Sequence, residues 1–374
     1  MRIPEFKLER YFAKWEFHAP YLLCSSDLEG WRMGDLLALA DDDARERWER
    51  LGLGYTESTG LPALREALAG LYPGVAADQV LTFAGAQDAL FAALNVLLGP
   101  GDHAVVTWPG YQSLYEVARA TGADVTLLRL REEDGWKVDL AEVERALRPE
   151  TKALVVNFPH NPTGALPDAD TWRGLFALAE ARGVYVLSDE VYRLLEYDPR
   201  DTLPSAAELS PRGVSVGVMS KAFGLAGLRV GWLATRDAGL LARCAAFKDY
   251  TSLCNAAPSE VLALIALRAR ERVLARSQAL LADNLTRLDD FFARRGELFS
   301  WVRPRAGSVA FPRWKGPGPV EAFCQSLVER EGVLLLPGGV YDFPGEHFRL
   351  GFGRTNLPEA LARLERFCDT LPQR

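Results

Sequence analysis

The stretch VMSKAFGLAGLRVG, from Val218 to Gly231, places one lysine, Lys221, between a serine and a run of small and apolar residues. An arginine, Arg229, follows eight positions later. Apolar surroundings disfavour the charged form of a lysine and make its amine available as a nucleophile. The stretch therefore predicts a reactive lysine rather than a solvated surface residue.

The chain around this lysine alternates short apolar runs with helical patterns, from about residue 55 to residue 235. The runs are rich in β-branched residues and predict buried strands: HAVVTW (103–108), DVTLLRL (124–130), KALVVNF (152–158), VYVLSD (184–189), VSVGVM (214–219) and VGWLAT (230–235). Helical patterns lie between them, as in PALREALAGLY (62–72), AQDALFAALNVLL (86–98) and TWRGLFALAEARG (171–183). This alternation predicts an α/β fold with a largely parallel sheet covered on both faces.

The pattern changes from about residue 258 onward. A long helical stretch (259–295) precedes WVRPRAGSVAFPRW (301–314), which has the pattern of a hairpin-like pair of strands. A helix (320–332), two strands (333–338 and 347–353) and a closing helix (357–371) follow. We expect a large domain over residues 46–257 and a small α+β domain over residues 258–374. Residues 1–45 form an N-terminal arm and part of the small domain.

Composition excludes several classes of protein. The formal net charge of -7 offers no basic excess for nucleic-acid phosphates. The five cysteines have no CxxC spacing and the four histidines are dispersed, so no metal site is expected. The first residues, MRIPEFKLERYFAKWEF, lack the apolar run of a signal peptide, and no segment is apolar enough to cross a bilayer. We expect a cytoplasmic protein with no nucleic-acid or membrane partner.

Three polar motifs follow predicted strands of the large domain. They are NFPHNPTG (157–164), SDEVY (188–192) and SKAFGLAGLR (220–229). Parallel strands bring their carboxyl ends to one side of a sheet, where ligand crevices form. We therefore expect the three motifs to meet in one crevice.

These motifs, together with a late FRLGF (348–352), resemble the class I/II aminotransferases and their fold-type-I pyridoxal-phosphate-dependent relatives. The resemblance extends from GYTESTGLPALREALA (54–69) to the last helix, with five motifs in the order of the family. It implies a mostly parallel sheet of the seven-stranded type between helices, plus the smaller α+β domain. It also implies a pyridoxal 5′-phosphate-dependent aminotransferase that moves an amino group from an L-amino acid to a 2-oxo acid through a Lys221 Schiff base.

The resemblance assigns residues to the cofactor ring. Lys221 would hold the aldehyde and later move the substrate's α-proton. Asp189 would face the pyridine nitrogen and keep it protonated. Asn161 and Tyr192 would donate to the phenolic oxygen, and Tyr111 would stack on the ring. Considered singly, Asp189 could instead be a helix cap, NPTG a plain turn and Tyr111 a core tyrosine.

The cofactor's phosphate needs backbone donors and a cation. In FAGAQDALF (83–91), Gly85 permits close approach, and Ala86 and Gln87 offer N–H groups at a helix start. Ser220 and Arg229 match phosphate ligands of the family, while Val218 stands where many members carry a second hydroxyl. Tyr55 matches a tyrosine that reaches the phosphate of the neighbouring subunit. The resemblance therefore implies a homodimer with shared active sites.

The substrate's α-carboxylate is expected at Arg349, with Asn161 beside it. Arg349 lies between Phe348 and Leu350 on a predicted strand, and a buried charge there needs a partner. The resemblance gives it the α-carboxylate, held bidentately. An internal salt bridge is the alternative.

The sequence leaves open which residues recognise the substrate's side chain and which reaction the enzyme completes. The aromatic arm YFAKWEFHAPY (11–21) could form an apolar wall for larger or aromatic amino acids, or a dimer contact. SSDLEGWRMGDLLAL (25–39) resembles capreomycidine-synthase-like members, so a same-fold lyase (β-elimination) or cyclase is the alternative function. A non-catalytic transcription regulator of this fold is not expected, because the chain has no basic excess with which to bind DNA. A nucleotide-binding dehydrogenase is not expected either, because no GxGxxG motif follows a strand of the large domain.

Overall fold

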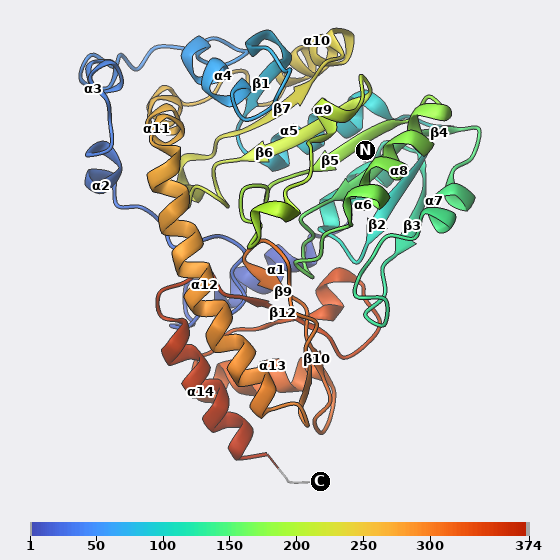
Figure 1. Cartoon of the computed structure of the whole chain (residues 1–374), viewed down its shortest axis with the longest axis vertical. Helices are drawn as coiled ribbons and strands as arrows, with labels where there is room; N and C mark the ends of the chain where they lie inside the picture. The colour runs from blue at the N-terminus through green and yellow to red at the C-terminus, as the bar shows by residue number, and fades with distance from the viewer. Residues whose placement is uncertain (1, 372–374) are drawn as a thin grey trace.

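A central sheet of seven strands organises the molecule (Figure 1). The computed structural model describes residues 2–371. The strands lie in the order β1 (Val80–Phe83), β7 (Gly231–Thr235), β6 (Gly213–Val218), β5 (Tyr185–Asp189), β4 (Thr151–Asn157), β2 (His103–Trp108) and β3 (Asp124–Arg129). Strand β7 is antiparallel to both of its neighbours, and the pairs from β6 to β3 are parallel. The predicted α/β fold with a mostly parallel sheet is confirmed.

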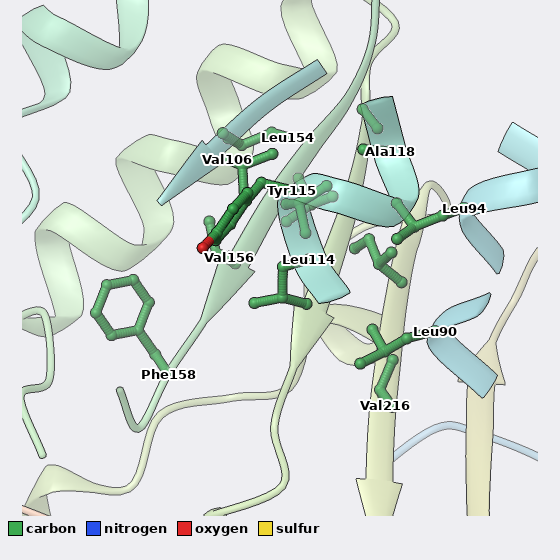
Figure 2. Close-up of a cluster of buried hydrophobic side chains, with 14 of the residues drawn as sticks. Leu90, Leu94, Val106, Leu114, Tyr115, Ala118, Leu154, Val156, Phe158 and Val216 are labelled. Atoms are coloured by element: carbon green, nitrogen blue, oxygen red, sulfur yellow. The ribbon is translucent and has the colours of Figure 1, made fainter. Parts of the chain in front are cut away.

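Helices join the strands and bury their apolar faces. They are α4 (Pro62–Ala69), α5 (Ala86–Leu97), α6 (Gln112–Ala120), α7 (Leu140–Ala146), α8 (Ala169–Ala181), α9 (Ala206–Leu209) and α10 (Ala238–Lys248), with short 3-10 turns η1 (Ala77–Gln79), η2 (Pro199–Asp201) and η3 (Ala226–Leu228). Figure 2 shows side chains of α5 and α6 meeting those of β2, β4 and β6 in a buried apolar cluster. Burial on both sides explains the β-branched runs of the parallel strands.

The C-terminal part consists of helices around two small sheets. The helices are α11 (Ala257–Arg268), α12 (Arg270–Arg294), α13 (Val320–Glu331) and α14 (Leu357–Asp369). One sheet has the order β11 (Leu336–Pro337), β12 (Phe348–Gly351), β9 (Val309–Ala310), and the other pairs β10 (Arg313–Trp314) with β8 (Phe299–Ser300). The long helical stretch is thus two helices that meet at Ala269.

The hairpin predicted over residues 301–314 is wrong. Strand β9 pairs with β12, and β10 pairs with β8, so the two strands of the segment belong to different sheets. Pro312 lies between β9 and β10 and has no N–H to donate to a ladder between them. Gly307, at φ +79, turns the chain before β9.

The N-terminal arm joins the small sheets and lies across the middle of the molecule. It contains α1 (Lys7–Trp15), α2 (Met33–Leu37) and α3 (Asp42–Glu49). Tyr21 forms a parallel bridge with Val333, and the carbonyl of Leu23 accepts from the N–H of Gly351 at 3.2 Å. Helix α1 packs against η4 (Gly338–Tyr341), and the ring of its Phe12 lies 5.8 Å from the guanidinium carbon of Arg349 in β12. The residue boundaries of the three regions stay a prediction.

Helices that could span a bilayer are absent from residues 2–371: none is both long enough and apolar enough.

Candidate active site

A cavity of about 330 Å³ opens where the carboxyl ends of β4, β5 and β6 meet the N-terminal arm. Its walls carry most of the residues that the sequence singled out: Ala86, Gln87, Tyr111, Asn161, Asp189, Ser220, Lys221, Arg229 and Arg349. The arm supplies a second group of lining residues: Leu8, Glu9, Phe12, Glu16, Ser25, Ser26 and Asp27. The expected convergence of the three strand-end motifs is therefore present in the folded chain.

Lys221 lies just beyond the end of β6, with its amine in the cavity. Its Nζ donates a hydrogen bond to Oγ of Ser26 at 2.8 Å and lies 5.8 Å from the centre of the Tyr192 ring. Burial of the amine lowers the pKa of Lys221 to about 8, and the negative charge of Asp27 opposes that shift. Near neutral pH the site thus holds an appreciable fraction of the neutral, nucleophilic amine.

Asp189 is the last residue of β5 and is 4% exposed. Its Oδ1 accepts from the backbone N–H of Val191 at 3.3 Å, and within residues 2–371 it forms no ion pair. Burial is the main cause that raises the pKa of Asp189 to about 7. A buried carboxyl that faces the cavity and makes no ion pair among the described residues has the chemistry to receive a protonated ring nitrogen.

Arg349 is held in β12 with one side of its guanidinium left unsatisfied. Its Nε donates to the carbonyl of Cys24 at 3.0 Å, and its Nη1 donates to the Tyr341 hydroxyl at 2.7 Å. Asn161 Oδ1 lies 3.4 Å from Nη1 and 3.2 Å from the Tyr341 hydroxyl. Nη2 is buried without a partner among the described residues.

Arg349 is 1% exposed and lines the cavity, and it forms no salt bridge within the described part of the chain. The arrangement favours the expected carboxylate ligand over the internal ion pair, because a carboxylate would satisfy the free side of the guanidinium.

One end of the cavity is built on the start of α5, where Ala86 and Gln87 line it. No side chain caps this helix, and Gly85 before it has φ +99, which a side chain rarely adopts. A Cβ at Gly85 would lie 2.6 Å from Nη2 of Arg229, so the guanidinium packs directly against the loop. Gly231 of β7 also packs directly against this loop: a Cβ at Gly231 would lie 2.4 Å from the carbonyl carbon of Gly85. Free N–H groups at a helix start, next to an arginine, form an anion site.

The remaining predicted residues lie in different surroundings. Tyr111 lines the cavity with its ring 5.1 Å from that of Phe6. Tyr192 is fully buried outside the lining, and its hydroxyl donates to the carbonyl of Ser26 at 3.1 Å. Tyr55 is 91% exposed and lies away from the cavity, where only another molecule could use its hydroxyl. Val218 lines the cavity without offering a hydroxyl.

Sequence reasoning raised the arm as an apolar wall or a dimer contact, but it missed the arm's carboxylates Glu9 and Glu16 and the contact of Tyr341 with Arg349. Glu9, Phe12 and Glu16 have the i, i+3, i+7 spacing of one helix face, which was a readable signal for a shared wall. Asp27 lines the cavity with Lys221, and each of its two carboxylate oxygens accepts a hydrogen bond from Nη2 of Arg354 at 2.9 Å. In the described residues no cluster of metal-binding side chains occurs.

The family model described as aminotransferase class I and II matches residues 28–366. The chain belongs to this family. The aminotransferase is 31% identical to capreomycidine synthase of Streptomyces vinaceus, over 97% of this chain and 93% of that protein. It is 32% identical to arginine–pyruvate transaminase AruH of Pseudomonas aeruginosa, over 83% of this chain and 81% of that protein.

A solved structure, a PLP-dependent aminotransferase from Streptococcus suis 89-1591, matches all of both chains with a TM-score of 0.94 and 32% identity. Family and fold confirm the predicted enzyme class, the fold type and the dependence on pyridoxal phosphate.

The residues present fit that cofactor. The uncapped start of α5 and Arg229 suit its phosphate, the unpaired carboxyl of Asp189 suits its ring nitrogen, and the amine of Lys221 suits its aldehyde. When bound, pyridoxal phosphate supplies an electron sink conjugated to the substrate's α-carbon.

Proposed function

We propose that this aminotransferase moves the amino group of an L-amino acid to a 2-oxo acid, with Lys221 as the catalytic residue. The observation that carries the proposal is the placement of the Lys221 amine in one cavity with Asp189 and with the free side of Arg349. A nucleophilic amine, a carboxyl for the ring nitrogen and a cation for the substrate's carboxylate are the three groups that this reaction needs.

Lys221 has two tasks in the proposed reaction. Its Nζ would hold the cofactor by the aldehyde, and as a free amine Nζ would take the proton from the substrate's α-carbon. Ser26 holds Nζ at 2.8 Å, which fixes where that proton is taken. The lowered pKa of Lys221, about 8, keeps part of the amine unprotonated for this step at neutral pH.

The other residues bind and orient. Arg349 would hold the α-carboxylate, while Tyr341 and Asn161 fix the guanidinium. Asp189 would keep a positive charge on the ring nitrogen. Ser220, Arg229 and the N–H groups of Ala86 and Gln87 would anchor the phosphate, with Asn161 and Tyr111 beside the ring. Tyr192 acts in this arrangement by holding the Ser26 carbonyl rather than by lining the cavity.

The test is a visible spectrum of the purified protein with pyridoxal phosphate, recorded for wild type and Lys221→Ala, before and after addition of an amino acid. Lys137→Ala, a change at an exposed lysine, is the matched control. We expect a long-wavelength band in wild type and control that the amino acid bleaches, and no such band in Lys221→Ala. A band of equal strength in Lys221→Ala would overturn the assignment of the catalytic lysine.

A same-fold cyclase or lyase is the second candidate, supported by the 31% identity to capreomycidine synthase over nearly the whole chain. The two outcomes differ in their need for an amino acceptor. A transaminase stops after one turnover without a 2-oxo acid, whereas a lyase or cyclase continues. Multiple turnovers of an amino acid, including a hydroxylated arginine, without added 2-oxo acid would favour the second candidate.

We also propose a homodimer with shared active sites. The support is three exposed apolar side chains outside the cavity lining: Leu53 at 85%, Tyr55 at 91% and Tyr250 at 92% exposure. Such apolar exposure is typical of interaction surfaces. Light scattering gives the mass, and co-expression of Lys221→Ala with a Tyr55 variant should restore activity if each site uses both chains. A monomer at assay concentration would contradict the proposal.

A cytoplasmic location is proposed from the cysteines, all of which are free, four of them buried. Unpaired thiols are typical of proteins in a reducing compartment. Fractionation of the producing cells tests this.

A further inference from the structure

Two carboxylates of the cavity, Glu9 and Glu16, have no partner. Both line it, and in residues 2–371 neither side chain makes an ion pair or a hydrogen bond. Glu9 lies on α1 and Glu16 is the C-cap of that helix, so the pair is separated by two turns on one face. Phe12 lies between them in sequence and also lines the cavity. This acidic face of α1, formed by Glu9 and Glu16, closes the cavity on the arm side.

The proposed chemistry accounts for every other charge of the cavity. Arg229 serves the phosphate, Arg349 the α-carboxylate and Asp189 the ring nitrogen, while Lys221 reacts. Asp27 is already paired with Arg354 through two 2.9 Å contacts. Glu9 and Glu16 are the acidic groups of the lining that remain without an assigned partner.

An independent observation indicates where a substrate's carboxylate would bind relative to this face. The buried, unpartnered Nη2 of Arg349 calls for a carboxylate in the same cavity, and the Arg349 guanidinium carbon is 5.8 Å from the centre of the Phe12 ring. When an amino acid has its carboxylate at Arg349 and its α-carbon near Lys221, the cofactor would fill the part of the cavity formed by the strand ends. The side chain of that amino acid would then face the wall that the arm provides.

We propose that the acidic face of α1 selects amino-acid substrates whose side chain ends in a positive charge, a guanidinium or an ammonium group. This inference rests on the proposed aminotransferase function. The ring of Phe12 and the side chain of Leu8 line the route to the carboxylates and suit the methylene stem of such a side chain. The terminal cation would form charge-assisted hydrogen bonds with Glu16 and Glu9.

The electrostatics of the face agree with this assignment. Glu16 is half-buried, whereas Glu9 is exposed. Burial is the main cause that raises the pKa of Glu16; the negative charges of Asp27 and Glu9 raise it further, and the positive charges of Arg354 and Arg349 lower it. Glu9 and Glu16 repel each other, and a cation placed between them relieves that repulsion. A neutral or acidic side chain would leave that repulsion in place, so the same wall also rejects it.

The experiment compares L-arginine with L-citrulline, which has nearly the same shape but a neutral terminal group, and L-lysine with L-norleucine. For each donor, kcat/KM is measured on the pyridoxal-phosphate-loaded protein for wild type, Glu9→Gln, Glu16→Gln and the double variant. Glu5→Gln, at an exposed acid of the same arm outside the cavity, is the control. Calorimetric binding of arginine and citrulline to loaded Lys221→Ala gives a readout that needs no turnover.

We expect wild type to prefer each cationic donor over its neutral counterpart. Each Gln variant should lose roughly tenfold in kcat/KM for the cationic donors, as is typical of one charge-assisted contact, with a change below about twofold for the neutral ones. Whether arginine or lysine loses more distinguishes a guanidinium site from an ammonium site. The control should match wild type.

Equal use and equal binding of citrulline and arginine would overturn the inference while leaving the proposed function intact. An equal loss for charged and neutral donors in the Gln variants would also overturn it, because that pattern shows a structural role. Absence of transamination with every donor, beside tighter calorimetric binding of arginine, would instead refute the proposed function and support the acidic face as a cation-binding wall.

Discussion

Replacing Asp189 with asparagine should stabilise the cofactor-free aminotransferase and weaken its hold on pyridoxal phosphate. The carboxyl is 4% exposed and lacks a cationic partner among the described residues, and burial raises its pKa from 3.8 to about 7. An acid whose pKa is raised in the folded state destabilises folding progressively as pH rises from its unfolded pKa to its folded pKa. Above the folded-state pKa of Asp189, the full destabilisation applies.

The magnitude follows from 1.36 kcal/mol per pH unit: the cost of ionised Asp189 in the folded apoprotein is about 4 kcal/mol near pH 8.5 and about 2 kcal/mol near pH 5. Asparagine avoids this cost at every pH, but its buried amide lacks an acceptor, which costs about 2 kcal/mol. The variant should therefore be more stable than wild type by about 2 kcal/mol near pH 8.5 and equally stable near pH 5.

The assay is urea unfolding of cofactor-free protein at both pH values, with Asp78→Asn, a change at an exposed aspartate, as the control. The cofactor-free proteins are then titrated with pyridoxal phosphate, for which Asp189→Asn should show the weaker affinity, because asparagine cannot balance a protonated ring nitrogen. A difference in unfolding free energy that stays constant between the two pH values would refute the reasoning, as would a less stable variant near pH 8.5.

Two further substitutions test how the site is held. Tyr341→Phe removes the 2.7 Å partner of Arg349 Nη1, so KM for the amino donor should rise by roughly three- to tenfold with kcat less affected, and an unchanged KM in steady-state kinetics would count against the role of Tyr341. Gly231→Ala places a Cβ 2.4 Å from the Gly85 carbonyl carbon, so stability should fall by about 1–3 kcal/mol and pyridoxal-phosphate affinity should fall with it. Gly227→Ala, which meets no atom within 4 Å, is the control, and equal affinities in the two glycine variants would contradict the argument.

The central sheet could be predicted from the sequence because its pattern is local. Each of the six predicted strands is present, since a strand buried on both faces needs a continuous run of apolar and β-branched residues. The strand-end motifs were equally readable, because parallel strands fix the side of the sheet on which their loops meet. Lys221, Asp189 and Asn161 share the cavity for that reason.

The small sheets and the arm could not be predicted in the same way, because their partners are distant in sequence. Strand β9 has two residues, and its pairing with β12 depends on packing rather than on a local turn signal. Tyr341 was not singled out because a tyrosine beside glycines has no motif, and only the fold brings its hydroxyl to Arg349 and Asn161.

The division between predictable and unpredictable residues follows the chemistry of the site. The groups proposed to serve the cofactor come from strand ends and the start of α5, where local sequence fixes backbone geometry. The groups proposed to face the substrate's side chain come from α1, which is held by contacts such as that between Tyr11 and the carbonyl of Leu335, 324 residues away. The cofactor part of such a site can be recognised from motifs. The part proposed to select among amino acids depends on a single helix face, and if that proposal holds, Glu9 and Glu16 are the positions at which a change of substrate charge should be compensated first.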